Sequence, residues 1–185
     1  MIESTYWKTE LFVAADEIER KCLINRWTEK QAVLLEREIM LAMFCVRCLI
    51  ERSKLSDSLV RKTVEVTAYP KKVEQPVTVL NRGDIDELYD LSVTETKSVT
   101  LLFLCNQIVH SYIIFPMRDG TRDFTHIIVC SDYERNRFLY TVPITTMVTL
   151  IREVAFDYPA HMELEYDPKI KDYRITHGEL RDSSA

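Results

Sequence analysis

Two polar side chains, Asn106 and His110, stand four residues apart in the apolar segment Leu101-Leu-Phe-Leu-Cys-Asn-Gln-Ile-Val-His110. The pattern of residues 94–115 is typical of a helix, on which such a spacing places both side chains one turn apart on one side. An unpaired buried polar group costs about 1–3 kcal/mol, so each needs a partner from another helix, a second subunit or a ligand. Because imidazole exchanges protons near neutral pH, His110 is a candidate general acid or base. Asn106 is then the residue that orients it or the substrate.

A purely structural role for His110 is the alternative interpretation. The imidazole then bonds to a backbone carbonyl, or to Glu36 or Glu38 of the preceding long helix, and takes no part in chemistry. The sequence leaves both roles open.

The sequence Cys105-Asn106-Gln-Ile-Val-His110 resembles the signature of the HEPN superfamily (higher eukaryotes and prokaryotes nucleotide-binding). That signature is an arginine, a polar residue that is often asparagine, three further residues and a histidine on one helix. The resemblance covers residues 5–115 at most and implies a helical bundle that forms a homodimer through the 94–115 helix. Many members are metal-independent endoribonucleases of toxin–antitoxin, CRISPR and phage-defence systems. The resemblance therefore implies RNA as a partner and no cofactor.

Cys105 stands where the family has its arginine. In the family that arginine is thought to position the scissile phosphate and stabilise its developing charge, which a neutral thiol cannot do. We therefore expect a non-catalytic interaction or regulatory protein with an HEPN-like helical core. One alternative is an endoribonuclease in which Arg47 or Arg37 supplies the missing guanidinium. The other is a sensor that binds a small ligand between the helices and the sheet.

A candidate binding edge lies in two loops on either side of a predicted strand. Its residues are Arg118, Arg122, Tyr133, Arg135 and Arg137. Arginines beside an aromatic ring suit RNA or another anionic partner. Acidic residues are interspersed in both loops, so the alternative is a set of solvated loop charges.

Composition excludes several classes of protein. The three glycines argue against a glycine-rich phosphate loop, and the net charge of -5 gives no overall field that attracts nucleic acid. RNA binding must therefore depend on a local site. Cys45 and Cys48 have metal-ligand spacing but lie within a predicted helix without a second such pair, so we predict no metal. The odd number of five cysteines indicates reduced thiols and a cytoplasmic location.

Hydrophobic periodicity predicts the elements that position these residues. An amphipathic helix is predicted at 5–24, and a capping box of Thr28 and Gln31 opens a long central helix to about Ser53. Alternation predicts a strand at 61–69, with a second extended piece at 77–80 paired to it. Further on we predict strands at 124–130 and 138–142, a helix from Pro143, and strands at 162–166 and 170–175.

The predicted fold class is α+β in one structural unit. Residues 1–115 form the HEPN-like helical core with a short β insertion at 61–80, and residues 116–185 add a small antiparallel β-sheet with one packed helix. The longest apolar run, at 39–50, falls short of the ~20 residues that a membrane span requires. The first residues also lack the pattern of a signal peptide, so no membrane association is expected.

Overall fold

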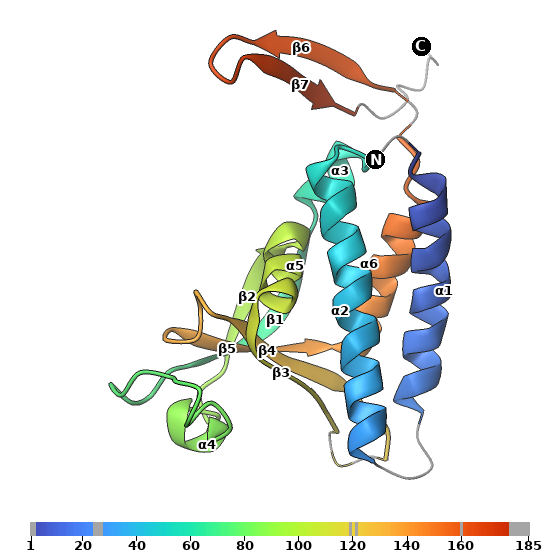
Figure 1. Cartoon of the computed structure of the whole chain (residues 1–185). Coiled ribbons are helices and arrows are strands. Elements are labelled where there is room, and N and C mark those ends of the chain that lie inside the picture. Colours follow the sequence, from blue (N-terminus) through green and yellow to red (C-terminus); the bar gives the residue numbers. More distant parts are fainter. Residues whose placement is uncertain (1–2, 24–27, 119, 121, 160, 178–185) are drawn as a thin grey trace.

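The computed structural model describes residues 3–23, 28–118, 120, 122–159 and 161–177. It contains a five-stranded antiparallel sheet in the order β2-β1-β5-β4-β3 and a separate two-stranded sheet, β6-β7 (Figure 1). The helices are α1 (Thr5–Cys22), α2 (Glu29–Glu51), α3 (Asp57–Arg61), α4 (Ile85–Leu88), α5 (Leu101–Val109) and α6 (Ile144–Phe156). The strands are β1 (Thr63–Pro70), β2 (Glu95–Thr100), β3 (Ser111–Met117), β4 (His126–Ser131), β5 (Phe138–Pro143), β6 (Glu163–Asp167) and β7 (Asp172–Thr176). The predicted α+β class is confirmed.

The long helix α2 follows directly from its sequence. Thr28 is its N-cap, as predicted, and the hydroxyl of Thr28 accepts a hydrogen bond from the N–H of Gln31 at 3.2 Å. Its buried residues recur every three or four positions, which is the spacing of one helix face. They are Leu35, Ile39, Ala42, Met43, Val46 and Leu49. This face packs against α1 on one side and α5 on the other (Figure 1).

The sheet separates two apolar clusters. One face, with Ile127 and Val129 of β4, packs against the helices, and the other, with Ile128 and Cys130, packs against residues 71–91. The boundary predicted between residues 115 and 116 falls inside β3, and the sheet combines strands from both sides of that boundary. Both parts of the chain therefore share one core.

The helix predicted over residues 94–115 is wrong. Residues 95–100 form β2, only residues 101–109 form the helix α5, and β3 begins at Ser111. Thr100 is the N-cap of α5, and its hydroxyl accepts from the N–H of Phe103 at 3.2 Å. The flanking residues are rich in β-branched side chains, which favour strands, and they pair with β1 and β4.

The strand predicted at 77–80 is also wrong. β1 pairs with β2 and β5 instead. Val77 is buried at 0 % exposure, but it belongs to the non-strand segment that covers the second face of the sheet. Its apolar character therefore reflects packing on a sheet face.

The predicted hairpin around residues 132–137 is confirmed as β4 and β5, and the helix after Pro143 is confirmed as α6. The last two predicted strands pair as the hairpin β6-β7, which Figure 1 shows beyond the ends of α1 and α2. Among the described residues no helix is long and apolar enough to cross a membrane.

A buried lysine ties α1 to the ends of α2 and α6. Lys8 is 1 % exposed, and its ammonium donates to the carbonyl oxygens of Lys54, at 3.0 Å, and Asp157. The ammonium also lies 4.4 Å from the ring centroid of Tyr158. Burial lowers the pKa of Lys8, and the nearby charge of Asp157 opposes that shift. Lys8 is therefore a hydrogen-bond donor that these two carbonyl oxygens share.

We expect Lys8→Met to lower the free energy of unfolding by about 1–3 kcal/mol, because methionine fills the space but leaves the two carbonyl oxygens without their donor. Urea denaturation measures the change. The matched control is Lys30→Met at an exposed position of α2, with an expected effect within about 0.5 kcal/mol. Equal stability of the Lys8 variant and the wild type would contradict a structural role for the ammonium.

Candidate functional site

A pocket of about 540 Å³ opens between α2, α5 and the turn at residues 132–137. Its lining includes Arg47 from α2 and Asn106 and His110 from α5, which are the three residues predicted to be catalytic. Tyr133, from the predicted binding set, also lines it. The structure thus brings together residues that are up to 86 positions apart in the sequence.

The central contact of this pocket joins Arg47 to His110. Nη1 of the guanidinium contacts Nε2 of the imidazole, while Nε of Arg47 donates to Oε1 of Glu51 at 2.8 Å. A guanidinium has donors only, so Nε2 of His110 takes the acceptor role in this contact. Arg47 is 25 % exposed and His110 is exposed, so the contact is open to a ligand.

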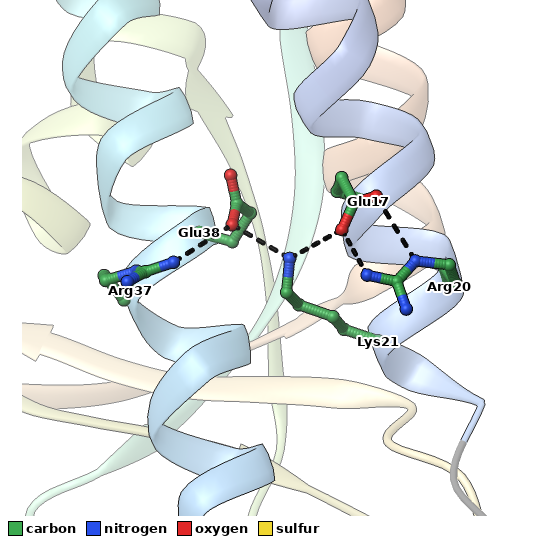
Figure 2. Close-up of polar contacts among 5 residues, drawn as sticks. All are labelled: Glu17, Arg20, Lys21, Arg37 and Glu38. Carbon is green, nitrogen blue, oxygen red and sulfur yellow. Dashed lines mark hydrogen bonds and ion pairs between the residues drawn. The ribbon is translucent and has the colours of Figure 1, made fainter.

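The carboxylates predicted as alternative partners of His110 lie elsewhere. Glu38 forms an ion pair with Lys21 at 3.0 Å (Figure 2), and Glu36 lines a different pocket. Arg37 does not enter the site either, because its Nη2 lies 3.8 Å from Oε2 of Glu38. It precedes Arg47 by ten residues, which is about 15 Å along the helix axis.

Asn106 presents an unsatisfied acceptor. Its side-chain oxygen Oδ1 is buried and has no hydrogen-bond partner in the described part of the chain. An unpaired buried acceptor costs about 1–3 kcal/mol, and a rotation of the side chain that brings Oδ1 to a donor in the pocket recovers that energy.

The turn at residues 132–137 forms the wall that the sequence did not reveal. The N–H of Asp132 donates to the carbonyl of His110 at 3.2 Å, and the N–H of Ser131 donates to Oε1 of Gln107 at 2.9 Å. Gln107 is 4 % exposed, so its side chain is buried in this contact. These two bonds fix the turn against the end of α5. From the sequence, only a turn between two strands could be predicted at residues 132–137, and its contact with α5 could not.

The predicted binding edge is not one surface. Arg118 and Arg122 lie between β3 and β4, whereas Tyr133, Arg135 and Arg137 lie between β4 and β5. The two groups are therefore at opposite ends of β4, whose six residues span about 20 Å.

The arginines of the turn have acidic partners. Arg135 pairs with Asp132 at 3.2 Å, and Arg137 pairs with Glu134 at 3.1 Å. Glu134 is 5 % exposed and also accepts from the hydroxyl of Tyr140 at 2.9 Å. The charges of this turn are thus largely compensated. Arg47, which is itself paired with Glu51 at 2.8 Å, and His110 are the remaining basic groups in the lining of the pocket.

Cys105 is part of the core. It is 0 % exposed, and burial raises the pKa of its thiol to about 12. The thiol is therefore neutral and packed, which agrees with the expectation that it cannot bind a phosphate. Among the described residues, no group of three or more histidine, cysteine and acidic side chains is arranged to hold a metal ion.

Comparisons with known proteins give no relative: the chain matches no protein-family model, no curated protein and no solved structure. The resemblance of Cys105–His110 to the HEPN signature therefore stays a prediction, and the functional argument depends on the geometry of the pocket.

We expect Cys105 to resist alkylation by iodoacetamide in the folded protein at pH 8. With a pKa of about 12, only about one thiol in ten thousand is ionised at that pH, and the side chain is covered. Peptide mass spectrometry measures the modification, with urea-denatured protein as the control in which Cys105 reacts. Rapid modification of folded protein at this residue would show that position 105 is accessible to ligands.

Proposed function

We propose that this protein is a metal-independent endoribonuclease whose active site is the pocket of Arg47, Asn106 and His110. The observation that carries the proposal is the contact of the Arg47 guanidinium with the His110 imidazole in an open pocket. In this proposal Arg47 of α2 supplies the positive charge that Cys105 of α5 cannot provide. The helical layer of α1, α2, α5 and α6 is the HEPN-like core in this proposal.

The imidazole of His110 acts as a general base once the Arg47 guanidinium turns from Nε2 to the phosphate, because the lone pair of Nε2 is then free to take a proton. In this mechanism His110 takes the proton from a ribose 2′-hydroxyl, whose oxygen attacks the phosphorus. The bond to the 5′-oxygen breaks, and that oxygen takes a proton from water, which leaves a 2′,3′-cyclic phosphate and a 5′-hydroxyl. The guanidinium of Arg47 donates to the non-bridging oxygens, where charge develops in the transition state. Asn106 Oδ1 accepts from the 2′-hydroxyl of the neighbouring nucleotide, since the reacting hydroxyl gives its only proton to His110.

The proposal keeps the predicted homodimer but changes the surface through which it forms. Within residues 94–115 only α5 is helical, and its half-buried outward residues are Leu102, Asn106 and Val109. A second copy packed on this face would lie beside the pocket. Light scattering tests the assembly, and a monomeric mass would remove the dimer while leaving the pocket of a single chain intact.

A non-catalytic interaction or regulatory protein is the second candidate. The observation that favours it is the ion pair between Arg47 and Glu51 at 2.8 Å, which compensates part of the charge of the guanidinium. In this case RNA or an acidic protein segment binds at the pocket without being cleaved.

We expect the purified protein to cleave single-stranded RNA in excess EDTA. His110→Ala lowers the rate about 10²- to 10⁴-fold, because the general base is removed. Arg47→Ala lowers it about 10²- to 10³-fold, because the developing charge loses its donor. The measurement is the initial rate of appearance of products that end in a 2′,3′-cyclic phosphate.

The matched control is Arg37→Ala, which removes an arginine from the same helix but away from the pocket, and its rate is expected to equal that of the wild type. Thermal unfolding of each variant shows that the fold is kept. Cleavage that is unchanged in His110→Ala, or absent from the wild type, would rule out the nuclease. RNA binding without cleavage would leave the second candidate.

A further inference from the structure

The ring of Tyr112, near the start of β3, contacts two arginines. The guanidinium carbon of Arg135 is 4.0 Å from the centroid of its ring, and that of Arg82 is 5.7 Å away. Nη1 of Arg82 also donates to the carbonyl of Tyr112 at 3.4 Å. Arginine planes and aromatic rings are the groups on which proteins stack unpaired bases.

The two arginines differ in how firmly they are held. Arg135 pairs with Asp132, and its carbonyl accepts from the buried hydroxyl of Tyr89 at 2.6 Å, so its place in the turn is fixed. Arg82 is exposed, and its contact with the ring is the longer one. The contact between Arg82 and Tyr112 is therefore the one that opens with less rearrangement.

A second pocket, of about 430 Å³, lies on this side. Glu36 and Met40 of α2, Arg82, and Tyr112 with its neighbours in β3 line it. Ser111 of its lining directly follows His110 of the first pocket, so the two pockets flank one short stretch of chain. Glu36 brings a carboxylate, which disfavours a phosphate here and suits a base.

We propose that this second pocket is a base-stacking subsite for single-stranded RNA, in which the base next to the phosphate held by Arg47 and His110 inserts between Arg82 and Tyr112. The inference rests on the proposed function, because it takes that phosphate as its reference point. Only Ser111 separates His110, the C-cap of α5, from Tyr112 of β3, so neighbouring nucleotides of one strand can reach the two pockets. The substrate class is therefore RNA with unpaired bases, since bases within a duplex are already stacked.

The test uses a single-stranded 2′-O-methyl hexanucleotide, which has no free 2′-hydroxyl and cannot be cleaved by this route. Its Kd is measured by fluorescence anisotropy. Tyr112→Leu is expected to raise Kd about 5- to 150-fold, because the stacking surface is lost. Arg82→Ala is expected to raise Kd about 2- to 5-fold, because the guanidinium of Arg82 is lost.

One variant and one ligand serve as controls. Tyr6→Leu removes a tyrosine of 76 % exposure on α1, away from both pockets, and is expected to have no effect. The duplex of the same sequence is expected to bind at least about tenfold more weakly.

Wild-type affinity in both Tyr112→Leu and Arg82→Ala would overturn the subsite, as would equal affinity for the duplex or no binding by the wild type. If Tyr112→Leu fails to fold, the subsite is tested by the Kd of Arg82→Ala, whose position is exposed, and by the comparison with the duplex. His110-dependent cleavage with unaltered binding in these variants rejects the subsite and keeps the nuclease. Binding that depends on Tyr112 without any cleavage rejects the nuclease and keeps the subsite.

Discussion

The packing of α2 against α5 is the constraint on which the candidate site depends. Val46 of α2 and Cys105 of α5 are both buried at 0 % exposure in this contact, so neither position is open to a ligand. Arg47 follows Val46 at the edge of the same contact, and its guanidinium reaches the imidazole at the end of α5. In the proposed function, the charge that Cys105 does not provide on α5 is supplied by Arg47 on α2.

Elements with long, regular periodicity could be predicted from the sequence, because each has an apolar face that is visible within one stretch of chain. The helix α2 and the hairpin of β4 and β5 are examples. Residues 94–115 could not be predicted, because α5 has only nine residues and a helix of that length is marginal without tertiary packing. The strands on either side of it are fixed by pairing with β1 and β4, and those partners lie elsewhere in the sequence.

The candidate site was predictable only in part, for the same reason. The spacing of Asn106 and His110 is local, and it identified two members of the pocket. Arg47 lies 63 residues from His110, so its approach depends on how two helices pack. Asp132 joins the site through a backbone bond that no sequence pattern reveals. The separation of the two arginine loops, in contrast, follows from the length of the strand between them.

The coupling between Arg47 and His110 in catalysis tests the central claim most directly. It is obtained from kcat/KM for metal-free RNA cleavage by the wild type, Arg47→Ala, His110→Ala and the double variant. Residues that act as one unit are strongly non-additive, so the double variant is predicted to be about as slow as the slower single variant. Losses that multiply, as for independent sites, would contradict the account.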